Sequence, residues 1–81
     1  MSEKLRTLSG DTVVKIFLRY GALYKRTTGS HARLAFDTDS GTRYITIPLH
    51  TELKKGTLHS IVKDFEQWFG NKAMRDEFYS Q

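Results

Sequence analysis

The residues best suited to chemistry lie in the middle of the chain, where Gly29-Ser30-His31 precedes a strand-like segment. The imidazole of histidine exchanges a proton near neutral pH, so it can take a proton from one oxygen and give one to another. Beside basic residues, His31 is suited to removing the proton of an RNA 2′-hydroxyl, which then attacks the adjacent phosphate. The alternative is an ordinary half-exposed polar residue at the start of a strand.

A second candidate is the pair Lys54-Lys55, which stands directly before a helix-like pattern. The first turn of a helix offers free backbone N–H groups and the positive end of the helix dipole, which together favour a phosphate. The two lysines, with Ser30 as a further donor, are suited to stabilising negative charge in a transition state. An exposed loop pair without a ligand is the alternative.

Metal and cofactor chemistry is not indicated by the sequence. His31, His50 and His59 lack a tight ligand spacing, and no carboxylate cluster accompanies them. The chain has no cysteine, which excludes a disulfide framework and a thiolate site. Gly56 and Thr57 follow Lys55 without a glycine-rich run, so a nucleotide-binding loop is not predicted.

The charge of the chain favours a polyanionic partner. The formal net charge is +4, and residues 19–55 carry seven basic and three acidic side chains. The basic ones are Arg19, Lys25, Arg26, Arg33, Arg43, Lys54 and Lys55. Such an excess attracts nucleic acid through counterion release. Ordinary solvated surface is the alternative, because many small basic domains bind no nucleic acid.

The length of 81 residues predicts a single domain over residues 1–81. No apolar run approaches the roughly 20 residues that cross a bilayer, and the N-terminal segment is polar. We therefore expect no membrane span and no signal peptide. The absence of cysteine fits a reducing compartment, and the expected location is the cytoplasm.

Two helices are predicted from apolar spacing. Ser9 is expected to cap a helix over residues 10–20, which Gly21 ends, with an apolar stripe that includes Tyr20. Thr57 is expected to cap the second helix, which Gly70 ends. Its stripe is the strongest in the chain: Leu58, Ile61, Val62, Phe65, Trp68 and Phe69. A last short helix is expected after Asn71, with Met74 and Phe78 one turn apart.

Three strands are predicted between the helices, at residues 22–27, 31–36 and 44–50. Residues 28–30 form the first turn and residues 37–42 a longer hairpin loop. Strict alternation places Lys25 and Arg26 on opposite faces of the first strand. Pro48 indicates that the third strand lies at an edge of the sheet, because proline lacks a backbone donor.

The fold class expected from this order is α+β, a helix, a three-stranded antiparallel sheet and a helix, with a short C-terminal helix. The helices cover one face of the sheet. The other face remains open, and its polar set is His31, Arg33, Tyr44, Thr46 and His50. Residues 1–8 show no period and are expected to be a loose lead-in.

An ordered set of short motifs carries a resemblance to a known family. The set is Gly21, Arg26, Gly29-Ser30-His31, Ile47-Pro48-Leu49-His50, Leu53-Lys54-Lys55-Gly56-Thr57-Leu58 and Ile61. The stretch 21–62 resembles HicA-type toxins, small mRNA interferases of prokaryotic toxin–antitoxin pairs. The resemblance implies a double-stranded-RNA-binding-domain-like fold, RNA cleavage by His31, no metal or cofactor, and a HicB-type antitoxin that blocks the site.

Together with the resemblance, the sequence predicts a metal-independent endoribonuclease toxin acting on mRNA, with His31 as the catalytic residue. The expected RNA contacts are Lys25, Arg26, Gly29, Ser30, Arg33, Lys54 and Lys55. The acid–base partner of His31 is unassigned, and His50 is one candidate. The alternatives are a non-catalytic RNA-binding module that recognises A-form shape and a domain that binds only protein.

Overall fold

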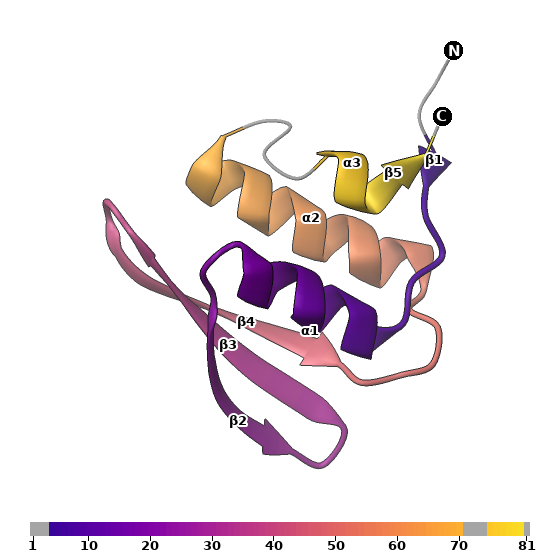
Figure 1. The fold of residues 1–81 in the computed structure, drawn as a ribbon, viewed down its shortest axis with the longest axis horizontal. Helices are drawn as coiled ribbons and strands as arrows, with labels where there is room; N and C mark the ends of the chain where they lie inside the picture. Colours follow the sequence, from indigo (N-terminus) through magenta and orange to yellow (C-terminus); the bar gives the residue numbers. More distant parts are fainter. Residues whose placement is uncertain (1–3, 71–74, 81) are drawn as a thin grey trace. The chain divides into compact units, whose positions relative to one another are not determined.

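The computed structural model of the chain describes residues 4–70 and 75–80. They belong to two compact units, one of which is Leu8–Leu53 while the other combines Met1–Thr7 with Lys54–Gln81. In chain order the elements are β1 (Lys4–Leu5), α1 (Gly10–Arg19), β2 (Leu23–Thr28), β3 (His31–Thr38), β4 (Gly41–Pro48), α2 (Lys55–Phe69), α3 (Arg75–Phe78) and β5 (Tyr79–Ser80) (Figure 1). This order confirms the predicted α+β class and agrees with the double-stranded-RNA-binding-domain-like fold.

The sheet of the first unit is an antiparallel meander in the order β2-β3-β4, so β2 and β4 are its outer strands. The edge position that Pro48 predicted for the third strand is therefore confirmed. That strand ends at Pro48, however, and His50 lies beyond it, so the predicted extent to residue 50 was wrong. The predicted loop at residues 37–42 was too long as well. Only Asp39 and Ser40 turn, and the Thr38 hydroxyl donates to the Gly41 carbonyl at 2.6 Å.

Helix α1 begins and ends as its sequence indicates. The Ser9 hydroxyl accepts a hydrogen bond from the Thr12 amide at 3.1 Å, and Gly21 adopts a φ of 99° after the last turn. The buried stripe comprises Val13, Val14, Ile16 and Phe17. Tyr20 is 44% exposed, so its predicted place in that stripe was wrong.

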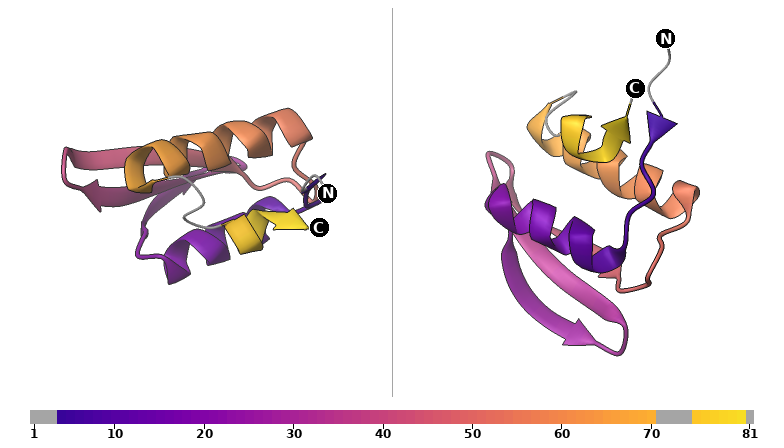
Figure 2. Two further views of the ribbon diagram at one scale, coloured as in Figure 1. Left: turned by 90° about the horizontal axis from the view of Figure 1, so that it is seen from above. Right: turned by 45° about the vertical axis from the view of Figure 1, so that its right-hand side comes forward.

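The apolar face of the sheet packs against α1 within this unit (Figures 1 and 2). Phe17 of α1 and Phe36 of β3 meet edge to face with ring centroids 5.5 Å apart. The buried side chains on this face of β3 and β4 are Ala32, Leu34, Phe36, Ile45 and Ile47. Within each strand, successive members of this set are separated by one residue that points to the other face, as strand alternation requires. Because α1 covers this face, the opposite face of the sheet is the one that carries the polar side chains.

The start of α1 is fastened to the chain that follows β4. The Gly10 amide donates to the His50 carbonyl at 2.9 Å, and the Leu53 amide donates to the Leu8 carbonyl at 2.8 Å. Gly10 is buried so closely that an added Cβ would overlap the Pro48 carbonyl oxygen. A side chain is excluded at this position by space.

In the second unit, α2 buries Leu58, Ile61, Val62 and Phe65, which confirms most of the predicted stripe, and Gly70 ends the helix. The N-cap is Lys54, which makes no side-chain capping bond, so the prediction that Thr57 caps the helix was wrong.

The short strands β1 and β5 lie near the two ends of the chain. β1 pairs with β5, and Arg6 donates from its backbone to the Phe78 carbonyl at 2.7 Å.

Within the predicted lead-in, Lys4 and Leu5 form β1 in a two-stranded ladder, so the prediction that this part of the segment is loose was wrong. The last helix of the chain is α3, and Phe78 is fully buried. The predicted cap at Asn71 and the contact of Met74 lie outside the described residues. Among the described helices, none is long and apolar enough to cross a lipid bilayer.

Replacing Gly10 by alanine tests the close approach between α1 and β4. The added methyl group must displace the Pro48 backbone, so we expect Gly10→Ala to lower the free energy of unfolding by about 1–3 kcal/mol. Gly56→Ala is the matched control, because Gly56 is helical and an added Cβ there meets no atom within 4 Å. The control should raise stability by up to about 1 kcal/mol. Urea unfolding measures both, and a Gly10→Ala variant as stable as the native protein would contradict the packing described.

Candidate nucleic-acid interface

The face of the sheet opposite α1 carries the polar side chains of β3 and β4. His31 is exposed and Arg33 partly exposed on β3, while Tyr44 and Thr46 are exposed on β4. The register pairs Arg33 with Thr46 and Ala35 with Tyr44 across the two strands. These residues therefore form rows across one open face, as alternation in the sequence predicted.

A β-bulge in β2 changes which residues of that strand reach the open face. Tyr24 pairs with Leu34, but Arg26 pairs with Arg33, so Lys25 is an extra residue without a partner in β3. The prediction that Lys25 and Arg26 face opposite sides was therefore wrong. The extra residue shifts the alternation by one, and both side chains line the same depression with Arg33 and Tyr44.

This depression is a basic surface with an aromatic ring at its side. It has a volume of about 530 Å³ and is formed by Lys25, Arg26, Arg33 and Tyr44. The Arg33 guanidinium carbon lies 4.5 Å from the centroid of the Tyr44 ring, a cation–π contact. We call this surface the basic depression.

Arg26 and Arg33 are direct cross-strand partners, an arrangement of like charges that destabilises a sheet. Within the described part of the chain, no acidic side chain forms an ion pair with either of them. Two opposed cations without a carboxylate between them favour an anion supplied from outside. A phosphate is such an anion, and the arginine fork matches it in shape.

His31 borders a second, smaller hollow next to the basic depression. Its volume is about 220 Å³, and its lining residues are Arg26, Thr28, His31, Arg33 and Thr46. Both arginines are shared by the two hollows, so they form one continuous surface. Thr28 was predicted to lie in a turn, but it ends β2 and pairs with His31. Strand alternation in the sequence placed Thr46 on the open face. The same pattern would have placed Thr28 there only if the bulge in β2 had been known.

The turn at Gly29 and Ser30 fixes where His31 enters the sheet. Gly29 has a φ of 58°, as the first residue of a tight two-residue hairpin turn requires. The Ser30 carbonyl accepts a hydrogen bond from the Leu49 amide at 2.6 Å, which fastens the turn to the segment after β4. Gly29 and Ser30 thus have a positioning role in this structure, and their predicted RNA contact stays a prediction.

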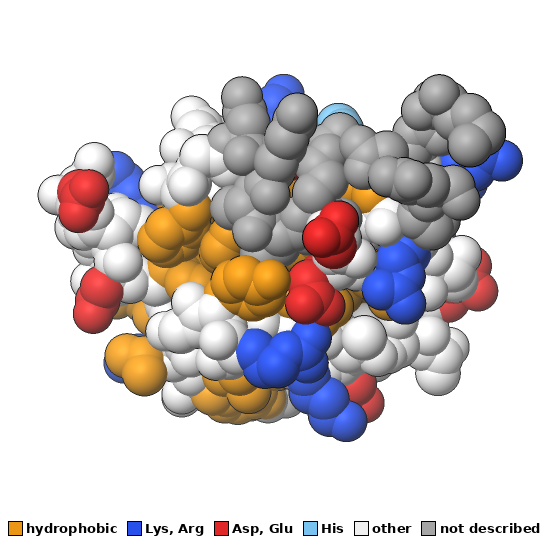
Figure 3. All heavy atoms as spheres, turned by 45° about the horizontal axis from the view of Figure 1, so that its top comes forward, with side chains coloured by type: hydrophobic (Ala, Val, Ile, Leu, Met, Phe, Trp, Pro, Cys, Tyr) orange, Lys and Arg blue, Asp and Glu red, His pale blue; other side chains and the backbone are white. Residues whose placement is uncertain are grey.

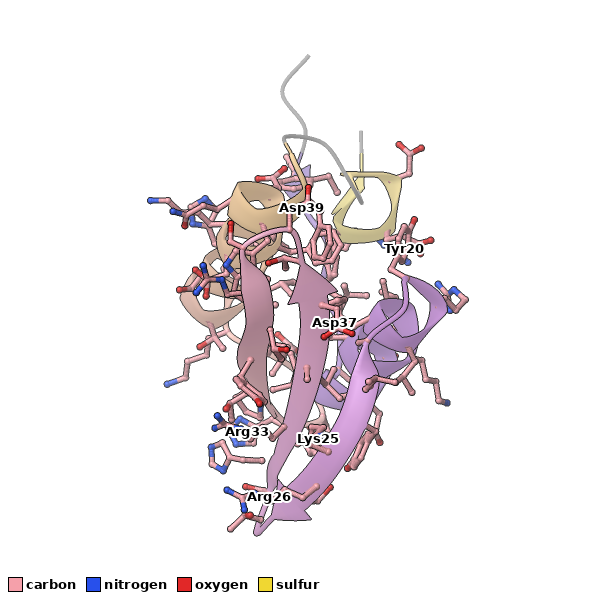
Figure 4. The ribbon with its side chains drawn as sticks, turned by 90° about the vertical axis from the view of Figure 1, so that its left-hand side faces the viewer. Tyr20, Lys25, Arg26, Arg33, Asp37 and Asp39 are labelled. Carbon is pink, nitrogen blue, oxygen red and sulfur yellow. The ribbon has the colours of Figure 1, made fainter. Side chains whose placement is uncertain are left out.

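Three cations of β2 and β3 and two carboxylates near the end of β3 lie apart along the sheet. Figure 4 shows Lys25, Arg26 and Arg33 toward the end that carries the Gly29–Ser30 turn, whereas Asp37 and Asp39 lie toward the other end. The Asp37 carboxylate accepts a hydrogen bond from the Thr42 hydroxyl at 3.1 Å. Figure 3 shows acidic side chains next to basic ones at several places on the surface. The local charge at the His31 end of the open face therefore favours a polyanion.

Comparison of the chain with models of known protein families identifies a family. A family model described as "HicA toxin of bacterial toxin-antitoxin" matches residues 10–67, well over half of the chain. The chain belongs to the HicA toxin family. As a member of that family it is the toxin of a toxin–antitoxin system, and its partner is an antitoxin. No curated protein and no solved structure matches the chain.

Besides Gly29 and Ser30, three predicted site residues of this HicA family member are not among those that line the two hollows. Lys54 and Lys55 belong to the other unit, where they are exposed at the start of α2. His50 is exposed after β4. Their action together with His31 stays a prediction. Among the described residues, no group of three histidine, aspartate or glutamate side chains is placed to hold a metal ion.

The opposed arginines should lower the stability of the HicA sheet when no anion lies between them. Replacing Arg26 by glutamine removes the repulsion, so we expect Arg26→Gln to raise the free energy of unfolding by about 0.2–1 kcal/mol at low salt. The gain should shrink at about 1 M salt, where the Debye length is near 3 Å.

Arg43→Gln is the matched control, because Arg43 is an exposed arginine of the same sheet whose cross-strand partner is Phe36. It should change stability little at either salt concentration. Urea unfolding curves measure both variants. A loss of stability in Arg26→Gln at low salt would show that the pair is not repulsive in the folded protein.

Proposed function

We propose that this toxin is a metal-independent endoribonuclease, an mRNA interferase in which His31 is the catalytic residue. The observation that carries the proposal is the pocket that His31 shares with Arg26 and Arg33 on the open face. An exposed imidazole beside two guanidinium groups that have no carboxylate partner among the described residues combines a proton acceptor with a phosphate site. Family membership supports the toxin role, and the pocket supports the chemistry.

The proposed reaction begins at the 2′-hydroxyl of one nucleotide. The His31 imidazole accepts the hydroxyl proton, and the 2′-oxygen forms a bond to the adjacent phosphorus. The bond from phosphorus to the 5′-oxygen breaks, which leaves a 2′,3′-cyclic phosphate on one product and a 5′-hydroxyl on the other. The departing 5′-oxygen takes a proton from an acid, for which His50 is a candidate. Proton transfer of this kind contributes about 10²–10⁴-fold to a rate.

The arginines stabilise the charge that develops on the phosphate. During the attack, negative charge increases on the two non-bridging oxygens, and Arg33 and Arg26 donate charge-assisted hydrogen bonds to them. The cation–π contact of Arg33 with Tyr44 restricts the guanidinium before RNA arrives. Lys25 extends the binding surface along the RNA backbone. The Thr28 and Thr46 hydroxyls, which line the same pocket, supply further donors.

Lys54 and Lys55 are proposed as further RNA contacts from the second unit. Helix α2 has no acidic residue in its first turn. No carboxylate there offsets the positive charge of the two lysines or the partial positive charge of the free N–H groups. The proposal treats residues 1–81 as one functional domain, because both units must then meet the same RNA. A HicB-type antitoxin is the proposed inhibitor, and the cytoplasm, where mRNA is translated, is the proposed location.

Replacing His31 tests the catalytic assignment. We expect His31→Ala to lower the rate of cleavage of a long mRNA transcript by about 10²–10⁴-fold, with the fold unchanged by circular dichroism. His59→Ala is the matched control, because His59 is an exposed histidine of α2 and should leave the rate unchanged. The native protein should keep its activity in EDTA and give 2′,3′-cyclic phosphate and 5′-hydroxyl ends.

Each outcome of this assay bears on one part of the proposal. A folded His31→Ala variant with full activity would remove His31 from the mechanism. Loss of cleavage in EDTA, or products with 5′-phosphate ends, would refute the metal-independent route. RNA binding without cleavage by the native protein would favour the non-catalytic RNA-binding module instead.

The role of Lys54 and Lys55 is tested by the salt dependence of RNA affinity. We expect the double variant Lys54→Gln/Lys55→Gln to reduce the slope of log affinity against log salt by about 1–2, because each lost phosphate contact removes about 0.7–0.9. The control Lys15→Gln/Lys63→Gln removes the same charge from two exposed lysines and should leave the slope nearly unchanged. Equal slopes for the two double variants would exclude Lys54 and Lys55 from the interface.

A further inference from the structure

A row of apolar side chains crosses the open face directly beyond the arginines. The register pairs Ala35 with Leu23 on one side and with Tyr44 on the other. Leu23 is 57% exposed and Tyr44 is 49% exposed, although both are large and apolar. Ala35 lies between them and is only 3% exposed, so the flanking side chains cover it. A polar open face thus contains one exposed aromatic platform.

The cation–π contact with Arg33 holds the Tyr44 ring beside the arginines that are proposed to bind phosphate. Arg33 precedes Ala35 by two residues, so Arg33 and Tyr44 are diagonal neighbours on the sheet, and the guanidinium lies 4.5 Å from the ring centroid. Ala35 is four residues after His31, about 13 Å along the strand. We therefore expect a base at Tyr44 to belong to a nucleotide that flanks the cleavage site and not to the cleaved one.

We propose that Tyr44, positioned by Arg33, stacks on an unpaired nucleobase, so that the protein selects single-stranded RNA. This inference rests on the proposed function and names its substrate form. The cations of the basic depression bind the backbone of any RNA, but the aromatic ring gains contact only with a base whose flat face is free. In a duplex each base is already stacked on its neighbours and its faces are not available.

Two other roles for an exposed tyrosine give different results in one experiment. Tyr44 would matter equally for all RNA forms if it only held Arg33 against a phosphate. It would not matter for RNA at all if it served only to contact the antitoxin. The stacking role alone makes its effect depend on the presence of a free base.

The test measures affinity for three probes that lack the reacting 2′-hydroxyl, so that binding is read without cleavage. They are a short 2′-O-methyl oligoadenylate, the same backbone without bases, and the oligoadenylate paired with its complement. We expect Tyr44→Leu to weaken binding to the oligoadenylate about tenfold, the lower part of the range for losing one stacked base. Its affinity for the other two probes should change less than twofold.

Tyr44→Phe is the matched control, because it keeps the ring and removes only the hydroxyl, and it should bind all three probes like the native protein. An equal loss for all probes, or no loss for any, would overturn the stacking role. These results are separate from the His31 assay. Base-dependent binding with an active His31→Ala variant would leave the stacking role and remove the catalytic one. Cleavage that requires His31 without base-dependent binding would do the reverse.

Discussion

The open face of this sheet depends on one irregularity in β2, the bulge that leaves Lys25 without a partner. Without it, Lys25 would stand opposite Arg33, and Arg26 would point to the apolar face. With it, Arg26 stands opposite Arg33, Thr28 opposite His31, and Lys25 joins the same depression. A single extra residue therefore assembles three cations on one surface beside the histidine. The repulsion between the two arginines is the energetic cost of this arrangement.

In the proposed mechanism, the surface combines three kinds of recognition in adjacent rows. The row at the end of the sheet contains His31 and Thr28, the next contains the arginines and Thr46, and the one after that contains Leu23 and Tyr44. One small sheet can therefore bind the charged RNA backbone, transfer a proton and contact a base. The proposed mechanism needs no cofactor. The turn at Gly29 and the bond from Leu49 to Ser30 hold the first row in place, because they fix the entry of β3.

Features that depend on local pattern were predictable from the sequence. Ser9 and Gly21 bound α1, the apolar stripe identified α2, and Pro48 marked an edge strand. The bulge was not predictable, since Lys25 carries none of the glycine signals that often accompany one. Thr57 was a plausible cap by residue type, yet the N-cap is Lys54, three residues earlier. The pairing of β1 with β5 joins two short segments far apart in sequence, and neither shows a period.

The outer position of β2 has a further consequence for a small basic protein. All six of its residues are exposed, and its free edge presents backbone donors and acceptors to the solvent. Such an edge is a template on which copies of a chain can add strand to strand and aggregate. The bulge bends this edge and two adjacent cations repel a second copy, both of which are known protections against that fate. We therefore expect the residues proposed to attract RNA also to oppose self-association of the free protein through this strand.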